Sequence, residues 1–311
     1  MPGTRPRIIY LPINYYIKIM ASHYIHFIVN PISGGGTHNI NAQMIRNFFP
    51  SYVVVVEYTQ YKGHAMALAT AAMENDPYCI VACGGDGTVN EVASCLVKSK
   101  IILGIIPVGS GNGLASHLKI PKQIDRAMDI ISKGRTIRID AGKANNYYFF
   151  SNMGIAIDGM IIKKYEKAKR KKLMAYAWAS FVAAFEYRTA ETLLNINGQN
   201  MWIEPMLLFI SNSNEMGYGM SLTPRASLTD GKLDIFMVPK INFFEKLQLA
   251  FSILKGTTES FKKARMIKCD TMNIVVPKKI FIDAQIDGEY HYLKTNKVYV
   301  TILKESLSVA F

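Results

Sequence analysis

The chain has 311 residues, of which 50% are hydrophobic, 19% charged and 11% aromatic. This composition excludes an intrinsically disordered chain, and the length favours two domains over one. An excess of 36 Lys and Arg over 23 Asp and Glu gives a formal net charge of +13. Such a balance favours an anionic partner: a nucleic acid, an acidic membrane surface or a polyphosphate ligand.

Residues 1–23 are predicted to be an N-terminal extension, with Met20 as an alternative translation start. Pro12 and Lys18 interrupt its apolar stretch, so a secretory signal peptide is the weaker alternative to this extension. No run of about 18 apolar residues is free of charge and proline, so no transmembrane helix is expected. The cysteines lack the paired spacing of a zinc site, and free, mostly buried thiols in a reducing cytoplasm are expected at Cys79, Cys83, Cys95 and Cys269.

From residue 24 to about 134, strand and helix patterns alternate. Apolar runs of strand length cover Tyr24–Asn30, Tyr52–Tyr58, Tyr78–Ala82 and Ile101–Pro107. Helical patterns lie between them at Ile40–Phe49, Gly63–Glu74 and Val89–Lys98. The alternation predicts an α/β domain whose parallel sheet is covered on both faces and binds a ligand beyond the carboxyl ends of its strands.

After about Arg135, short β-rich runs are separated by turn signals at Asn197-Gly198, Asp230-Gly231 and Asp287-Gly288. These features are typical of antiparallel hairpins. The second half is therefore predicted to be an antiparallel β-sandwich with helical insertions near Met160–Tyr187 and Phe243–Lys255.

Each of the four N-terminal strands is followed by a polar, glycine-containing loop. The loops are Asn30–Gly36, Thr59 to Ala65, Gly84–Glu91 and Gly109–Gly113. Glycine lets the backbone approach a phosphate closely, and N–H groups at a helix start can bind its oxygens. A turn such as Gly34–Gly36 is, taken alone, equally typical of a simple strand-to-helix connection. No Gly-Lys-Ser/Thr sequence is present, which excludes a Walker A loop, and the protein-kinase signatures are missing too.

These loops and several later segments resemble the diacylglycerol kinase catalytic-domain superfamily, in particular the bacterial lipid kinases and the related sphingosine and ceramide kinases. The matching segments are Asn30-Pro31-x-Ser33-Gly34, Thr59-x3-Gly63-His64-Ala65, Gly84-Gly85-Asp86-Gly87-Thr88-x-Asn90-Glu91, Pro107-x-Gly109-Ser110-Gly111-Asn112, Asn152-x-Gly154-x3-Asp158, Asp230-Gly231-x-Leu233-Asp234 and Asp287-Gly288-Glu289. The Gly-Gly-Asp-Gly-Thr core is shared with NAD kinases and, in variant form, with phosphofructokinases. The Asn-Pro start and the Asn-Glu continuation favour the lipid-kinase branch.

The resemblance implies an ATP-dependent lipid kinase that transfers the γ-phosphate of ATP to the hydroxyl of a membrane lipid, with Mg²⁺ as cofactor. It implies a nucleotide-binding domain of the NAD kinase and phosphofructokinase type over residues 24–140, completed by a strand within 297–311. A β-sandwich domain would cover residues 141–296. The implied ATP-binding residues are Asn30, Pro31, Ile32, Ser33, Gly34, Thr59, Gly85, Asp86, Gly87, Thr88, Val89, Asn90, Glu91, Ser110 and Asn112.

The resemblance also implies catalytic carboxylates. Asp287 and Glu289 would supply the base that takes the proton of the lipid hydroxyl. Asp86 would organise magnesium and phosphates and is a rival candidate for the base, and Asp158 would contact the lipid headgroup. Taken alone, Asp287-Gly288 is typical of a plain hairpin turn; both interpretations hold if the hairpin tip reaches the cleft.

Two departures from the family pattern affect these expectations. Ser110 and Gly113 replace the Thr and Asp of many bacterial members, so diacylglycerol, a sphingoid base and a ceramide-like lipid all remain candidate acceptors. Arg225 and Thr229 stand where some bacterial members carry acidic ligands. A structural magnesium ion needs such oxygen ligands, and none is predicted there.

The run Lys163–Lys172 has seven cations in ten residues. It is interpreted either as a solvated helical face or as a site that attracts anionic headgroups or ATP phosphates. The adjoining segment Leu173–Phe185 is predicted to be core or cleft lining and not a membrane insert. His64 is given no acid–base role, because it reads as a helix-start residue bonded to its own backbone.

The expected partners are ATP and a lipid at the membrane surface, with no nucleic acid, and a homodimer is left open. We expect a cytoplasmic protein that associates peripherally with the membrane. Two other functions remain: a catalytically silent ATP-binding regulatory protein and an NAD kinase-like enzyme.

Overall fold

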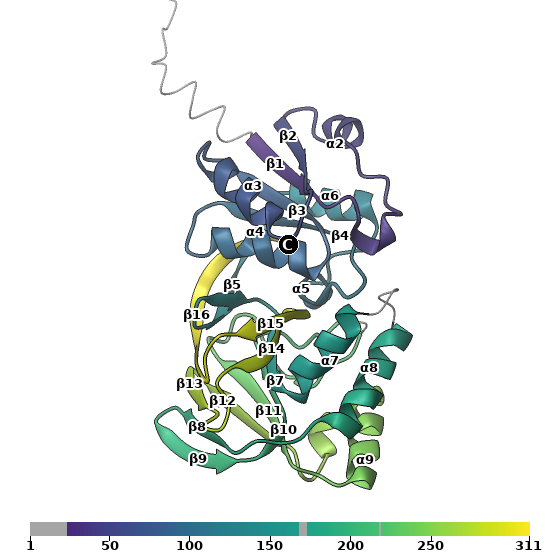
Figure 1. Ribbon diagram of the computed structural model, residues 1–311. Coiled ribbons are helices and arrows are strands. Elements are labelled where there is room, and N and C mark those ends of the chain that lie inside the picture. Colours follow the sequence, from purple (N-terminus) through teal and green to yellow (C-terminus); the bar gives the residue numbers. More distant parts are fainter. Residues whose placement is uncertain (1–23, 168–172, 218) are drawn as a thin grey trace, which may run out of the picture.

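The structure is a computed structural model that describes residues 24–167, 173–217 and 219–311. The predicted extension over residues 1–23 and residues 168–172 of the basic run lie outside this part of the chain. Figure 1 shows two stacked parts, the upper containing β1–β4 and α2–α6 and the lower containing most other strands and α7–α9.

The upper part holds the predicted parallel sheet. Strands β1 (Tyr24–Val29), β3 (Cys79–Gly84) and β4 (Ile102–Pro107) pair in parallel in that order, and β2 (Val53–Tyr58) pairs in parallel with the other side of β1. All six residues of β3 are buried, because helices cover both faces of the sheet. These helices are α2 (Ala42–Phe48), α3 (His64–Met73), α4 (Asp86–Leu96), α5 (Gly113–His117) and α6 (Ile124–Ser132), and a short 3-10 turn, η1, covers Ser33–Gly35.

Helix α4 begins three residues before its predicted start. Gly85 is its N-cap in extended conformation, and Asp86 occupies the first turn. An acidic side chain is stabilised there by the unpaired N–H groups of the helix start. The sequence pattern missed this turn because Asp86 and Gly87 are not apolar.

The long strand β16 (Lys297–Ala310) joins the upper part to the lower part. It pairs in parallel with β4 through Val309 and Leu103, and in antiparallel register with β13 (Thr271–Val275) and β5 (Thr136–Ala144). This pairing confirms the predicted return of the last strand to the upper part. A single ten-stranded sheet therefore runs through the molecule, completed by β8 (Thr192–Ile196), β9 (Gln199–Ile203) and β6 (Tyr147–Phe149).

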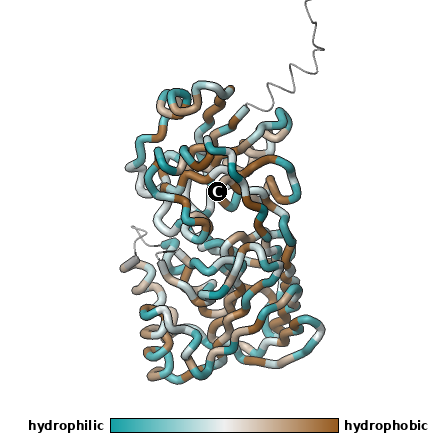
Figure 2. Tube along the Cα trace, turned by 180° about the vertical axis from the view of Figure 1, so that it is seen from behind, coloured by the Kyte–Doolittle hydropathy of each residue, from teal (hydrophilic) through white to brown (hydrophobic). Residues whose placement is uncertain are grey.

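The second sheet is antiparallel and has six strands, so the predicted sandwich is confirmed. Its strands lie in the order β12 (Arg265–Cys269), β11 (Leu233–Pro239), β10 (Pro205–Ser211), β7 (Asn152–Ala156), β14 (Ile282–Ile286) and β15 (Glu289–Leu293). In β10, Leu208 and Ile210 pack towards the larger sheet, whereas Leu207 and Phe209 pack under the helices. Both faces of this strand are covered, and Figure 2 shows hydrophobic residues concentrated along the inner strands.

The helices of the lower part are α7 (Ile157–Glu166), α8 (Leu173–Glu186) and α9 (Phe243–Leu254), with a short 3-10 turn, η2, at Thr258–Ser260. The predicted insertion at 160–187 thus forms two helices. A capping box of Asn242 and Glu245 sets the start of α9. None of the helices in the described ranges is long and apolar enough to cross a membrane.

The prediction that Leu173–Phe185 is core or cleft lining was wrong for one face of α8. Ala179 and Ala183 are buried, but Trp178 and Phe181 are 68% and 52% exposed. The pattern is apolar on all sides of the helix, so it could not reveal which side meets solvent. The prediction of free cysteines is confirmed: Cys79, Cys83 and Cys269 are buried, and Cys95 is partly buried.

Candidate functional site

A cleft of about 1130 Å³ lies between the two parts, at the carboxyl ends of the parallel strands. It is lined by segments of all four glycine-containing loops on one wall and by α7, α8 and the β14–β15 hairpin on the other. This is the place at which open parallel sheets bind their ligands.

The first and third loops are held together by side chains. Asn30 Nδ2 donates to Thr88 Oγ1 at 3.0 Å, and Gly85 N donates to Ser33 Oγ at 3.2 Å. Gly34 has φ +64°, and a Cβ there would overlap the carbonyl oxygen of Val108. Glycine is therefore required at Gly34 both by its backbone conformation and by the close packing of neighbouring loops.

Asp86 connects the third loop to the fourth. Its carboxylate accepts hydrogen bonds from Asn112 N at 2.8 Å and Gly113 N at 2.7 Å. Burial raises the pKa of Asp86 to about 6, although these two N–H groups favour the carboxylate. Asp86 also lines the cleft, so a bound phosphate or metal ion would meet it there.

Glu91 has a partly structural role. Its two carboxylate oxygens accept from Gly63 N at 2.8 Å and Ala65 N at 3.0 Å, at the start of α3. The carboxylate satisfies N–H groups that an isolated helix start would leave unpaired. His64 accepts a hydrogen bond from Gln60 N, as predicted for a residue bonded to local backbone.

Asp287 lies at the tip of the β14–β15 hairpin and is enclosed by donors. One oxygen accepts from Ser151 N and Asn152 N, and the other from Phe150 N and Asn90 Nδ2, at 2.8 to 3.0 Å. Burial nevertheless raises the pKa of Asp287. Because Asn90 belongs to α4, this carboxylate joins the two walls of the cleft.

Asp287 and Gly288 both have positive φ, 45° and 78°, as a type I′ turn requires. The hairpin interpretation is therefore confirmed, and the hairpin tip does reach the cleft.

Glu289 has a more open environment than Asp287. A Cβ added at Gly87 would overlap Oε1 of Glu289, so the carboxylate lies directly against the glycine loop. Its Oε2 pairs with Lys62 Nζ at 2.8 Å across the cleft, and the side chain is 32% exposed. Glu289 thus brings an accessible carboxylate to the expected phosphate position.

The lower end of the cleft is mainly apolar. Asp158 is buried there, its Oδ2 has no hydrogen-bond partner, and burial raises its pKa to about 7. The lining around it includes Ile162, Tyr165, Tyr176, Phe209, Met216 and Met220. This composition suits an apolar acceptor that carries a single polar group.

Most predicted site residues line the cleft. They are Asn30, Pro31, Ile32, Ser33, Gly34, Thr59, Gly85, Asp86, Gly87, Thr88, Glu91, Ser110, Asp158, Asp287 and Glu289. Val89, Asn90 and Asn112 are not part of this lining. Val89 packs in the core, Asn90 bonds to Asp287, and Asn112 closes the fourth loop by bonding to Gly109. Their contribution in the described structure is to hold the loops in position.

Sequence reasoning missed Lys62 and Glu166, which also line the cleft. Lys62 lies inside the second predicted loop, and a cation in a loop that is expected to bind phosphate could have been identified from the sequence. Glu166 could not have been found, because its place depends on how α7 packs against the hairpin; it accepts from Tyr290 N at 3.0 Å.

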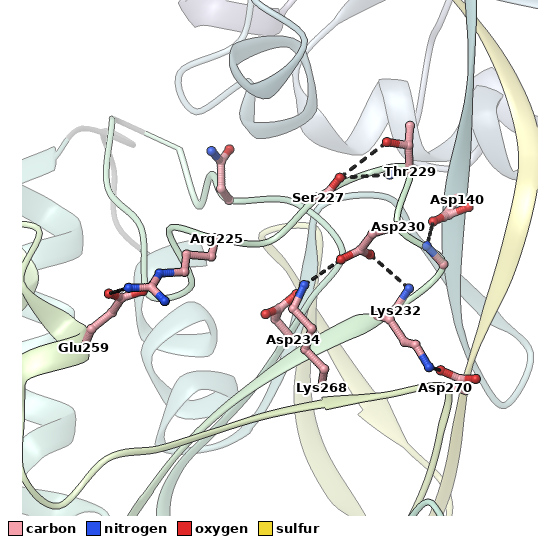
Figure 3. Close-up of polar contacts among 12 residues, drawn as sticks. Asp140, Arg225, Ser227, Thr229, Asp230, Lys232, Asp234, Glu259, Lys268 and Asp270 are labelled. Atoms are coloured by element: carbon pink, nitrogen blue, oxygen red, sulfur yellow. Dashed lines mark hydrogen bonds and ion pairs between the residues drawn. The ribbon is translucent and has the colours of Figure 1, made fainter.

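The region predicted to lack a structural magnesium ion carries ion pairs (Figure 3). Lys268 Nζ lies 2.5 Å from Asp230 and 3.4 Å from Asp234, and Arg225 pairs with Glu259. Lys268 thus supplies the positive charge beside these carboxylates. That no structural magnesium ion binds there stays a prediction.

Comparisons with known proteins agree with the two-part fold. Residues 24–144 match the diacylglycerol kinase catalytic domain, and residues 152–310 match the YegS C-terminal NAD kinase beta sandwich-like domain. Proteins named diacylglycerol kinase from Staphylococcus aureus strains JH9 and Newman are 28% identical over 281 residues, which is 85% of this chain and 85% of theirs.

Two solved structures of putative diacylglycerol kinases from Bacillus anthracis str. Sterne share the fold. They superpose with TM-scores of 0.77 and 0.74, each at 23% identity over 93% of this chain, and cover 95% and 97% of their own chains. At this identity the likeness concerns the fold alone.

Proposed function

Because the chain belongs to the family defined by the diacylglycerol kinase catalytic domain and its β-sandwich partner domain, we propose that it transfers the γ-phosphate of ATP to the hydroxyl of a membrane lipid. The observation that carries this proposal is the contact of Glu289 with Gly87. It sets an acceptor-side carboxylate against the glycine loop that would bind the phosphates. Phosphoryl transfer depends mainly on such alignment and on charge neutralisation.

The glycine loops form the nucleotide side of the proposed site. Ser33 and Asn30 fix the first loop to the third, and backbone N–H groups at the start of α4 are available for phosphate oxygens. Lys62, from the second of these loops, would be in reach of phosphates if its pair with Glu289 opens.

Magnesium would arrive with the nucleotide. In the described ranges, no cluster of three or more His, Cys, Asp or Glu side chains could hold a metal ion. The phosphates would supply most ligands, with Asp86 as the carboxylate of the phosphate loops. The ion would neutralise phosphate charge during transfer.

Glu289 is our candidate for the base. Asp287 already accepts four hydrogen bonds, which occupy both of its oxygens, whereas Glu289 has one ion-pair partner and faces the cleft. The lipid hydroxyl would give its proton to Glu289 as its oxygen bonds to the γ-phosphorus. The bond from that phosphorus to the bridging oxygen then breaks and ADP leaves. Asp287 would position the hairpin.

The apolar end of the cleft is the proposed acceptor side. Asp158, with its unpaired Oδ2, would accept a hydrogen bond from a headgroup hydroxyl or amine. The surrounding Tyr176 and Phe209 would contact the first carbons of the acyl or sphingoid chain. These contacts suit diacylglycerol, a sphingoid base or a ceramide-like lipid.

The test is phosphate transfer from labelled ATP, with magnesium, to diacylglycerol, sphingosine and ceramide in mixed micelles and to NAD in solution. Glu289→Gln should lower transfer by about 10²-fold or more, as expected for loss of a general base. Its thermal midpoint should equal that of the wild type, because Glu289 is partly exposed. Glu74→Gln, an exposed position at the end of α3, serves as the matched control.

Three results would contradict the proposal. ATP binding without transfer to any acceptor would indicate a catalytically silent nucleotide-binding protein. Transfer to NAD alone would indicate an NAD kinase-like enzyme. Full activity of Glu289→Gln would remove Glu289 as the base.

A further inference from the structure

An exposed apolar surface covers the outer faces of α8 and α9. It consists of Met174, Trp178, Phe181, Phe185, Phe243, Phe244, Leu247, Phe251 and Leu254, here called the α8–α9 ridge, whose exposed fractions run from 47% to 81%. A contiguous group of this many exposed apolar side chains usually marks a binding surface. The ridge is separate from the cleft lining, since none of its residues lines the cleft.

The ridge is continuous across the two helices. Trp178, Phe181 and Phe185 recur at helical spacing, and their rings are in contact at centroid distances of 5.8 and 4.9 Å. Phe185 then contacts Phe243 of α9 at 5.6 Å, and Lys246 Nζ donates to the carbonyl of Ala184 at 2.6 Å. The ridge is therefore one surface held by defined contacts.

Cations accompany the apolar side chains. Between residues 240 and 265, six basic residues stand against two acidic ones: Lys240, Lys246, Lys255, Lys262, Lys263 and Arg265 against Glu245 and Glu259. Lys255 lies over the ring of Phe251, with Nζ 4.4 Å from its centroid. Within the described residues, neither Lys255 nor Lys262 forms an ion pair with a carboxylate.

Charge favours an anionic bilayer over a second copy of the chain as the partner. Two copies facing each other through this ridge would bring their lysines together, and each chain carries a formal net charge of +13. A bilayer with acidic headgroups offers acyl chains for the aromatic rings and negative charge for the lysines. Trp and Phe on one helix face with Lys at its edge are typical of interfacial helices.

The position of the ridge relates it to the proposed reaction. Tyr176, on another face of α8, lines the cleft, so α8 lies between the cleft and the ridge. We propose that the α8–α9 ridge docks the protein on an anionic phospholipid bilayer and thereby places the acceptor end of the cleft at the membrane surface. This inference rests on the proposed lipid kinase function and names the surface through which it meets its substrate.

The two tryptophans of the chain provide the first test. Trp178 lies on the ridge and Trp202 on β9, 68% and 59% exposed, and Figure 1 shows β9 on the opposite side of the lower part. Trp202→Phe leaves only Trp178 as a fluorophore, and Trp178→Phe leaves only Trp202. With vesicles of phosphatidylcholine and phosphatidylglycerol, Trp178 emission should shift to the blue and be quenched by lipids brominated on their acyl chains. Trp202 emission should remain unchanged.

Two double variants complete the test, one with both substitutions on the ridge and one with both substitutions outside it. Trp178→Ser with Phe251→Ser should weaken vesicle binding by about tenfold or more, because two interfacial aromatic anchors are removed. Trp202→Ser with Tyr299→Ser removes two comparably exposed rings outside the ridge and should change binding by less than about twofold. Circular dichroism checks that both variants fold.

Phosphate transfer to a monomeric and to a vesicle-bound acceptor distinguishes a failure of the docking proposal from a failure of the proposed function. The ridge variant should phosphorylate monomeric dihexanoylglycerol like the wild type but lose transfer to long-chain diacylglycerol in vesicles. A wild-type protein that transfers phosphate to none of diacylglycerol, sphingosine and ceramide would contradict the proposed function, while the quenching data still decide the docking. Unquenched Trp178 with vesicles, or blue-shifted emission that rises with protein concentration alone, would overturn the docking proposal.

Discussion

The two walls of the cleft hold their functional groups in different ways. On the upper wall, loops that follow parallel strands present backbone N–H groups, and Asn30, Ser33 and Asp86 serve to hold these loops together. On the lower wall, Asp158 and Glu289 bring side-chain carboxylates from α7 and β15. In the proposed reaction, phosphate binding would therefore depend on backbone geometry, whereas proton transfer and acceptor choice would depend on a few side chains.

Replacing Asp287 tests whether this residue holds the hairpin in position and does not act as the base. The loss in the free energy of unfolding should be the largest effect of any variant. In Asp287→Asn an amide NH2 would face backbone N–H groups that now donate to a carboxylate oxygen. Unpaired buried donors should lower the free energy of unfolding by about 3 kcal/mol or more, measured by urea denaturation. Glu289→Gln, measured alongside, should unfold like the wild type. An Asp287→Asn protein of normal stability that transfers no phosphate would make Asp287 the base and reverse our assignment.

The pH dependence of the free energy of unfolding tests the raised pKa of Asp158, on the proposed acceptor side of the cleft. Burial raises the pKa of Asp158 from 3.8 to about 7, so the folded state retains a proton that the unfolded state loses in that pH window. Stability should therefore fall as pH rises from about 4 to about 7. Asp158→Asn, which resembles the protonated form, should be more stable than the wild type at pH 8 by a few kcal/mol at order of magnitude.

The matched control for this pH dependence is Asp125→Asn, an exposed position on α6. Its unfolding curves should follow those of the wild type at every pH. A pH profile of Asp158→Asn that coincides with the wild type would contradict the burial of the Asp158 carboxyl group and its raised pKa.

Gly87→Ala tests the contact that joins the two walls. The added methyl group would displace the Glu289 carboxylate, and transfer should fall roughly ten- to a hundredfold. Stability should not fall, because Ala has a higher helix propensity than Gly by up to about 1 kcal/mol. In the background of Glu289→Gln the same substitution should add little further loss. Equal losses in both backgrounds would show that the contact is irrelevant to the reaction.

The smallest effect on stability is expected at the ion pairs of Lys268 with Asp230 and Asp234, which do not line the cleft. Since Lys268 already neutralises Asp230 and Asp234, removal of metal ions by EDTA should leave the thermal midpoint unchanged while it stops phosphate transfer. Lys268→Met should cost about 1 kcal/mol or less, as for a partly exposed ion pair. A midpoint that drops with EDTA would reveal a structural metal ion.

The upper wall was largely predictable from sequence. Its loops follow apolar strands directly, and the parallel-sheet rule places such loops at one edge, so Asn30 and Asp86 could be assigned to one site. The lower wall was predictable only through the family resemblance, because Asp158 and Asp287 are 129 positions apart and the pairing of β7 with β14 brings their elements to one cleft. The exposed face of α8 could not be predicted, since its apolar residues encircle the helix.

Strand β16 has a consequence for the order in which the protein forms. Strand β4 pairs with β16 through Val309, and β5 depends on β16 along most of its length. During translation these edges stay without their partner until residues 297–310 have left the ribosome. The nascent chain therefore carries an open, apolar sheet edge for most of its synthesis, and such edges pair readily with other chains. We expect newly made chains to depend on chaperones until β16 is in place.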